Sequence, residues 1–163
     1  MTYSQDCVYL NSESEGCRLT TYDDARPNYV LQFGDTPIGK LTIGKGHTGP
    51  DVHIGLVWTQ AQADLQQAAD LEKACEQMQA LVKVPLTQGQ TDCLTDFCFN
   101  VGSGKLKAST LLKLLNMGEY DAACNELYRV DEDGNQHGFI FAGGKVLAGL
   151  VKRRQAEQAL WNK

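Results

Sequence analysis

The chain lacks several features that mark particular protein classes. Its 163 residues contain no internal repeat and no low-complexity tract, so neither a repeat array nor a disordered linker is expected. The first six residues have no basic start and no apolar run, which predicts neither a secretory signal nor stable membrane insertion. With a formal net charge of −5, no basic surface is expected to dominate, which disfavours nucleic acid as the main partner.

Metal-binding spacings are also missing. No two cysteines are spaced as a Cys-x-x-Cys pair, and His47, His53 and His137 stand outside any zinc-like cluster. The segment from Asp131 begins like a calcium loop, but Gln136 occupies the glycine position of such loops, which favours a plain turn. We therefore expect no metal and no organic cofactor.

The cysteines call for another interpretation. A cytoplasmic protein keeps its thiols reduced, and Cys93 and Cys98 flank apolar positions of a predicted helix, so we interpret both as small core residues. Formation of a disulfide after release from the cytoplasm stays an alternative. The six positions are Cys7, Cys17, Cys75, Cys93, Cys98 and Cys124.

What is present suffices for one folded domain. A length of 163 residues and a hydrophobic content of 42% support a single core, so we expect one domain over residues 1–163. Helices are predicted over about 4–14, 59–81, 87–101, 109–116, 120–128 and 147–161. The prediction is an α+β fold with a β-containing lobe over about 16–58, a connecting helix over about 59–82 and a helical lobe over about 83–163.

The most informative residue is Glu15. Ser4 is a good helix N-cap and Gly16 is a natural helix stop, which places Glu15 in the last turn of a short helix. The negative end of the helix dipole and partial burial both favour the protonated form of a carboxyl group there. A general acid needs that form near neutral pH.

A strand pattern follows this helix. Side chains alternate along a strand, so Asp23 and Asp24 should face opposite sides and only one can share a cleft with Glu15. A returning strand begins at Thr42, which could hold a water molecule against that aspartate, and the Gly44-x-Gly46 spacing lets the backbone turn tightly. Two carboxylates and a threonine on one hairpin are suited to cleaving a glycosidic bond with water.

These residues carry a family resemblance. The chain resembles the phage-type lysozymes and endolysins of glycoside hydrolase family 24, and nearly its whole length takes part. The matching segments are Glu15-Gly16-x-Arg18-Leu19, Asp24, Thr42-Ile43-Gly44-x-Gly46-His47-Thr48, Val84-Pro85-Leu86-Thr87-Gln88, Phe97-Cys98-Phe99-Asn100-Val101-Gly102, Ser109-Thr110-Leu111-Leu112 and Gly143-Gly144-Lys145 through Arg153-Arg154.

The resemblance implies roles for individual residues. Glu15 corresponds to the proton donor, Asp24 to the water-activating carboxylate and Thr42 to the residue that positions the water. Phe99 and Asn100 lie in a segment that the family places at the cleft wall, which implies contact with a sugar. The implied fold is lysozyme-like, with the active cleft between a small β-hairpin lobe and a larger helical lobe. His47 is expected to pair with an acid on the long helix, and Asp70 is our candidate.

The implied activity is that of an endolysin. Such a muramidase hydrolyses the β-1,4 bond between N-acetylmuramic acid and N-acetylglucosamine in peptidoglycan glycan strands, with inversion, and lyses the bacterial host. We expect a monomer, stored in the host cytoplasm without a signal peptide. A separate membrane-permeabilising protein would then release it to the cell wall.

The chain departs from the family pattern in two places. Residues Ala25–Leu41 form an insertion between Asp24 and Thr42, which predicts a longer loop or an extra pair of short strands. Because Asp35 lies nearer to Thr42 in sequence, it stays an alternative partner, although the spacing from Glu15 favours Asp24. Residues 129–138 are predicted to form a polar loop.

Other functions and readings stay open. A lytic transglycosylase could use Glu15 alone, a zinc amidase would cut the peptide stem, and an inactive relative would only bind the wall. The basic C-terminal segment is either a solvated helix face or a surface that approaches an anionic wall polymer, with arginines that help set the charge state of Glu15. Its charged residues are Lys145, Lys152, Arg153, Arg154 and Lys163, against the single acid Glu157.

Overall fold

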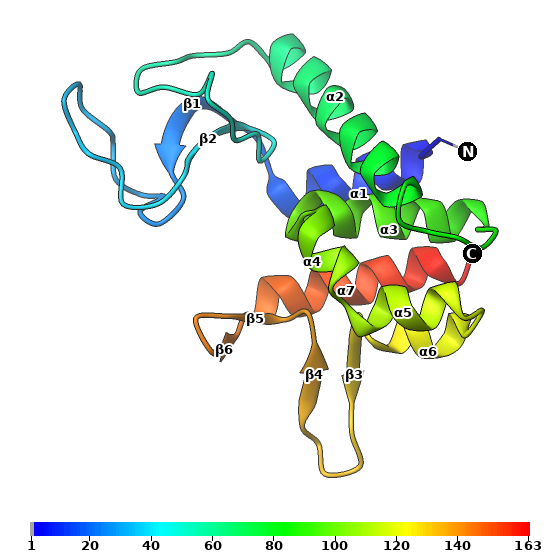
Figure 1. Cartoon of the computed structure of the whole chain (residues 1–163). Helices are drawn as coiled ribbons and strands as arrows, with labels where there is room; N and C mark the ends of the chain where they lie inside the picture. Colours follow the sequence, from blue (N-terminus) through cyan, green and yellow to red (C-terminus); the bar gives the residue numbers. More distant parts are fainter. Residues whose placement is uncertain (1) are drawn as a thin grey trace. The chain divides into compact units, whose positions relative to one another are not determined.

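The computed structural model describes residues 2–163, and within them the chain forms an α+β fold, as predicted (Figure 1). The chain divides into two compact units. We call Asn11–Asp70 the hairpin unit, and the residues up to Leu10 together with Leu71–Lys163 the helical unit. The elements are α1 (Gln5–Glu15), β1 (Arg18–Asp23), β2 (Leu41–Gly44), α2 (Gln60–Gln79), α3 (Gln88–Val101), α4 (Ser103–Lys107), α5 (Thr110–Asn116), α6 (Tyr120–Asn125), β3 (Tyr128–Val130), β4 (Gln136–Gly138), β5 (Phe141–Ala142), β6 (Lys145–Val146) and α7 (Ala148–Trp161).

The helical unit is built around α3, which packs along α7 (Figure 1). Phe97 of α3 is fully buried and meets the ring of Phe139 edge-on, with 4.8 Å between ring centroids. Cys93 and Cys98 are buried in the same core, which confirms their interpretation as small core residues. Further core members are Met78, Leu94, Leu106, Leu111, Leu115, Leu127, Leu160 and Trp161.

Local hydrogen bonds fix where these helices begin. Thr87 and Gln90 form a capping box at α3, in which each side chain accepts from the other residue's backbone N–H. The Ser109 hydroxyl accepts from the backbone of Leu112 and caps α5. Ser4 precedes α1, accepts from the backbone N–H of Asp6 and donates to Asp92 of α3. The cap predicted at Ser4 therefore lies at the start of a helix.

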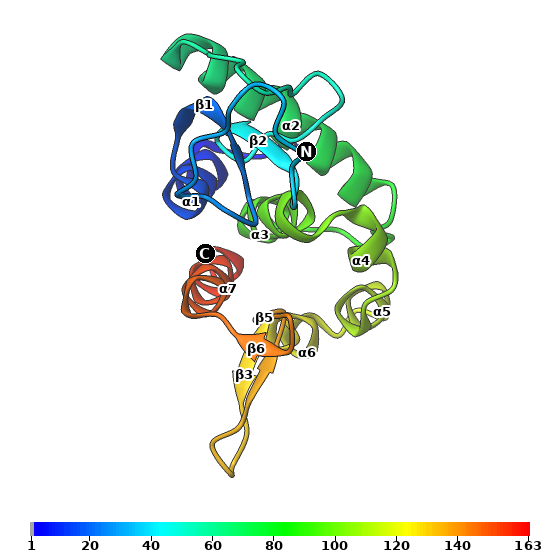
Figure 2. The same ribbon diagram turned by 90° about the vertical axis from the view of Figure 1, so that its left-hand side faces the viewer.

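Several elements of the helical unit differ from the prediction, and α4, β5 and β6 were not predicted. Residues 129–138, predicted to be a polar loop, include β3 and β4, which pair as an antiparallel hairpin that extends from the helices (Figure 2). Its tip is the predicted plain turn, where the Asp131 carboxylate accepts from the backbone of Asp133 and Asn135. The helix predicted to reach Tyr128 ends at Asn125, because Tyr128 pairs with Gly138 instead.

The basic residues expected at the surface of the C-terminal segment divide into two groups. Lys145, Lys152 and Lys163 are exposed, whereas the two arginines are buried. Arg153 is 5% exposed and donates to both oxygens of Asp96 at 2.8 Å. Arg154 is fully buried, lies 3.1 Å from the carboxylate of Glu157 and sits over the Phe97 ring. Burial raises the pKa of Glu157 and lowers that of Arg154, while their opposite charges act against both changes. Both arginines therefore belong to a buried ion cluster, not to a solvated face.

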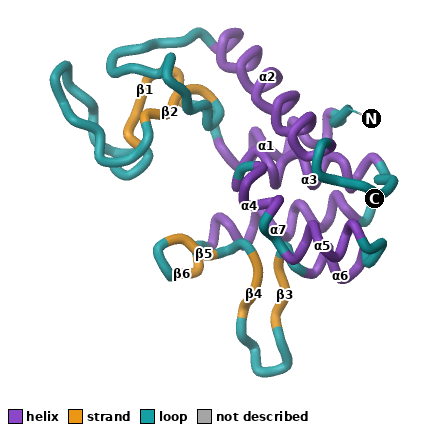
Figure 3. The backbone as a smooth tube through the Cα atoms, in the orientation of Figure 1, coloured by secondary structure: helices purple, strands orange, loops and turns teal. Residues whose placement is uncertain are grey.

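The hairpin unit holds β1 and β2, which pair antiparallel with Tyr22 opposite Thr42 and Asp23 opposite Leu41. The insertion between them is a long loop of turns, with no further strand among its described residues (Figure 3). Of the two predicted alternatives, a longer loop or an extra pair of short strands, the structure shows the loop. Among residues 2–163, no helix combines the length and the apolar character that a membrane crossing requires.

Candidate active site

Glu15 is the last residue of α1, which confirms its predicted place in the last turn of this helix. Gly16 follows with φ +65°, and its N–H donates to the carbonyl of Ser12, which closes the helix. The Glu15 carboxyl lies against Gly46 in the turn after β2. A Cβ atom added at Gly46, where φ is +82°, would lie 2.7 Å from Oε2 of Glu15. Only glycine therefore lets this turn approach the glutamate so closely.

Asp23 and Asp24 have opposite environments, as the strand alternation predicts. Asp23 is fully buried, whereas Asp24 is exposed. The Asp23 carboxylate accepts from the backbone N–H groups of Ala25, Ile38 and Gly39 and pairs with Arg26. The bond from Ile38 is the main reason why the pKa of Asp23 lies below its ordinary value. Asp23 therefore holds the two ends of the insertion together.

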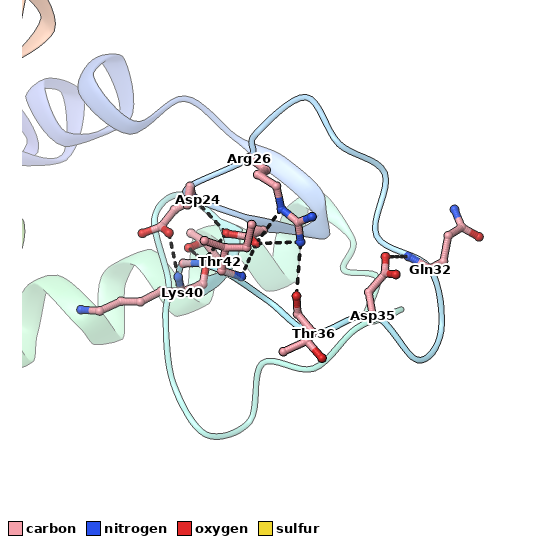
Figure 4. A network of polar contacts seen from close by, with 11 residues as sticks. Asp24, Arg26, Gln32, Asp35, Thr36, Lys40 and Thr42 are labelled. Atoms are coloured by element: carbon pink, nitrogen blue, oxygen red, sulfur yellow. Dashed lines mark hydrogen bonds and ion pairs between the residues drawn. The ribbon is translucent and has the colours of Figure 1, made fainter.

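Asp24 is hydrogen-bonded to Lys40, which directly precedes the strand that carries Thr42. Its Oδ1 accepts from the backbone N–H of Lys40 at 2.7 Å, and its own N–H donates to the carbonyl of Lys40 (Figure 4). Thr42 is 4% exposed, and its hydroxyl donates to the same carbonyl at 3.3 Å. Asp24 and Thr42 thus share the main chain of Lys40 as a common partner.

Asp35 has a different environment. Its carboxylate accepts from the backbone N–H of Gln32 at 2.7 Å (Figure 4). The hydroxyl of Tyr29 donates to the same carboxylate. These contacts close a turn inside the insertion. The polar contacts of Asp35 therefore lie within the loop, while those of Asp24 are with Lys40, directly before the strand of Thr42.

Tyr22 is a neighbour of the candidate site that was not predicted from the sequence. It is half-buried on β1 directly opposite Thr42. Burial is the main cause of its raised pKa, and the negative charges of Glu15 and Asp24 raise the pKa further. The phenol therefore lies close enough to both carboxylates for their charges to act on it. The sequence could have indicated this position. Tyr22 lies two positions before Asp24 at the end of β1, and side chains two positions apart in extended backbone face the same side.

His47 pairs with Asp70 of α2, as the resemblance implies. Its Nδ1 lies 2.7 Å from Asp70, its Nε2 lies 3.2 Å from Asp51, and its ring contacts Trp58. Two backbone bonds between Ile43 and His47 close the glycine turn. His47 therefore holds the turn and α2 together.

The two predicted sugar contacts belong to the helical unit. Phe99 packs partly buried against the core, and the side-chain oxygen of Asn100 accepts from Arg154. The hairpin unit by itself contains Glu15, Asp24 and Thr42. Within residues 2–163, no three His, Cys, Asp or Glu side chains are grouped to hold a metal ion.

Comparison with known proteins places this site in a family. The model of the phage lysozyme family matches residues 12–157. An endolysin of Bacillus phage B103 is 41% identical over 162 residues, which are 99% of this chain and 54% of the relative, so the chain spans about half of that protein. A SAR-endolysin of Bacteriophage PS119 is 32% identical over 94% of this chain and 80% of its own length.

Solved structures give the same relationship. The muramidase domain of SpmX from Asticaccaulis excentricus superposes with a TM-score of 0.75 and 30% identity, covering 99% of this chain and 98% of the domain. A family model that spans the proposed catalytic residues and a similar fold over the full length agree with each other. The chain belongs to the phage lysozyme family.

Proposed function

We propose that this chain is an endolysin-type muramidase that hydrolyses the β-1,4 bond between N-acetylmuramic acid and N-acetylglucosamine in peptidoglycan. One observation carries the proposal. Glu15, Asp24 and Thr42 all lie in one compact hairpin unit, inside the segment that matches the phage lysozyme family. The relatives named endolysins and the neighbour named a muramidase domain support this activity.

In the proposed reaction, Glu15 protonates the leaving oxygen while Asp24 takes a proton from a water molecule on the opposite face of the sugar. Thr42, which shares the Lys40 main chain with Asp24, positions that water. This division of roles yields inversion at the anomeric carbon and needs room for the water, with the two carboxyl groups roughly 6.5–9.5 Å apart.

Asn100 and Phe99 remain the proposed sugar contacts. Arg154 occupies the side-chain oxygen of Asn100, so the amide nitrogen is the donor that we assign to a sugar oxygen. Phe99, which is only partly buried, offers apolar surface to a sugar ring.

The mass of the products released from purified wall tests the proposal. Hydrolysis adds one water to each cleaved bond, whereas a transglycosylase leaves an anhydro-sugar end of lower mass. Glu15→Gln should reduce release by ~10²–10⁴-fold, because the leaving oxygen loses its proton source. Glu13→Gln, which removes a charge from an exposed position of the same helix, is the matched control and should keep activity.

Four outcomes would contradict the proposal. Anhydro products would make the enzyme a transglycosylase, and release of peptide stems that a chelator stops would make it a metal-dependent amidase. Wall binding without any release would make the chain a binding module. A folded Glu15→Gln protein that releases sugar at the parent rate would exclude Glu15 as the acid.

We also propose that a separate membrane-permeabilising protein gives this enzyme access to the wall. The proposal predicts that bacteria producing the chain alone keep their turbidity until the inner membrane is permeabilised with chloroform, and then lyse. Lysis before permeabilisation would instead show that the chain reaches the wall without such a protein.

A further inference from the structure

Lys45 stands at the tip of the turn that contacts Glu15. Gly44 and Gly46 flank it with φ values of +65° and +82°. The turn is packed on both sides, because a Cβ atom at Gly44 would lie 2.8 Å from the Trp58 ring and one at Gly46 would lie 2.7 Å from Glu15. A small displacement of this turn therefore changes the space that the Glu15 carboxyl occupies.

The side chain of Lys45 does not point freely into solvent, because only 15% of it is exposed. Its ammonium group lies 2.8 Å from the Asp64 carboxylate and donates to the side-chain oxygen of Gln67 at 2.9 Å and to the hydroxyl of Ser12 at 3.3 Å. These three acceptors use all three hydrogens of an ammonium group. The bond from Lys45 is also the main reason why the pKa of Asp64 lies below its ordinary value.

The acceptors come from both helices of the hairpin unit. Asp64 and Gln67 are on α2, and Ser12 lies three residues before Glu15 on α1. Gln67 is 3% exposed and also donates to Asn11 and Ser12, so it links α1 to α2 independently of Lys45. The lysine adds the glycine turn to this link.

We propose that Lys45 is a positioning residue for Glu15, which ties the Gly44–Gly46 turn to α1 and α2 and so holds the turn against the glutamate carboxyl. The inference rests on the proposed function, because it assigns to Glu15 the role of the acid. Lys45 acts through the turn and does not touch the substrate.

Kinetics on soluble wall fragments provide the first test. Lys45→Met keeps most of the stem but removes the donors, and kcat per folded molecule should fall roughly 10- to 100-fold, the range expected when a catalytic group is misplaced by up to about 1 Å. KM should stay within about twofold, since ground-state binding is unchanged. Lys45→Arg, which can still donate to Asp64 and Gln67, should recover most of kcat. Lys73→Met, at an exposed position of α2, the helix that carries Asp64 and Gln67, is the control and should match the parent.

A second measurement needs no activity. The amide of His47 donates to the carbonyl of Ile43 and closes the turn. In Lys45→Met this amide should exchange its hydrogen about tenfold faster, the factor that corresponds to one charge-assisted hydrogen bond. Amides in the core of α3 should be unaffected.

These measurements separate the two proposals. If the parent chain releases no sugar but His47 exchange responds to Lys45, the proposed function fails and the anchoring of the turn stands. The positioning role is overturned if Lys45→Met keeps the parent kcat, or if KM rises at constant kcat, which would make Lys45 a substrate contact. Unchanged exchange at His47 would overturn it as well.

Discussion

At the scale of single residues, the hydrogen bonds of the two candidate aspartates separate their roles. Asp24 shares the Lys40 main chain with Thr42, whereas Asp35 closes a turn with Gln32 and Tyr29. We predict that Asp24→Asn loses most turnover, by about the ~10²–10⁴-fold that a general base contributes. Asp35→Asn should retain it, and release of sugar from wall fragments measures both. A dead Asp35→Asn enzyme beside an active Asp24→Asn enzyme would reverse the assignment.

Asp23 is unsuitable as a control for this comparison. The sequence predicts that Asp23→Asn retains turnover because its side chain faces away from Glu15. Three backbone N–H groups donate to that carboxylate, however, and an asparagine amide would direct hydrogens at some of these donors. The substitution would loosen the loop that ends at Lys40, so reduced turnover would say nothing about direct participation.

At the scale of elements, the insertion between β1 and β2 should respond to acid. Its anchor Asp23 has a pKa below the ordinary 3.8, so it stabilises the folded loop fully above about pH 4 and loses that effect as pH falls through its own lower pKa. We predict that the amides of Ile38 and Gly39 exchange faster below about pH 4 than the core of the helical unit does. In Asp23→Asn they should exchange fast already at pH 6. Protected amides at pH 6 in that variant would contradict the anchoring role.

The buried ion cluster of α7 gives a second prediction for an element. Arg154→Met leaves the buried Glu157 with only the longer contact of 3.8 Å to Arg153, which should lower the free energy of unfolding by roughly 3–5 kcal/mol. Adding Glu157→Met should recover much of that loss, because the poorly paired charge is removed. Lys152→Met, an exposed neighbour, should stay within about 0.5 kcal/mol of the parent. Denaturant unfolding of the three variants checks this, and an Arg154→Met protein as stable as the parent would contradict it.

At the scale of the whole molecule, the six thiols should differ sharply in reactivity. Cys17 is exposed, while the other five cysteines are buried, and burial raises the pKa of Cys98 and Cys124 to about 11. We predict that one thiol reacts promptly with a disulfide reagent in the folded protein and six react in denaturant. Cys17→Ser should leave none that reacts promptly. Prompt reaction of several thiols in the native protein would show that the core opens readily.

Local signals account for what could be predicted from the sequence. A glycine after a helical pattern commonly ends the helix, so Gly16 was enough to place Glu15 in the last turn. Side-chain alternation depends only on adjacent residues, so it separated Asp23 from Asp24. The motif residues added the pairing of His47 with Asp70. The fold class and the family membership were therefore determined by the sequence itself.

Contacts between distant segments decided the rest. The sequence around Arg153 is typical of a surface charge. Its buried partner Asp96 lies 57 residues away in the chain, so the pair is visible only in the structure. The roles of Asp23 in the insertion and of Lys45 in the turn likewise depend on partners from other elements. Burial and charge pairing are properties of the groups that the fold brings together. The sequence therefore gives the position of a charged residue along the chain, but only the tertiary structure shows which groups surround it.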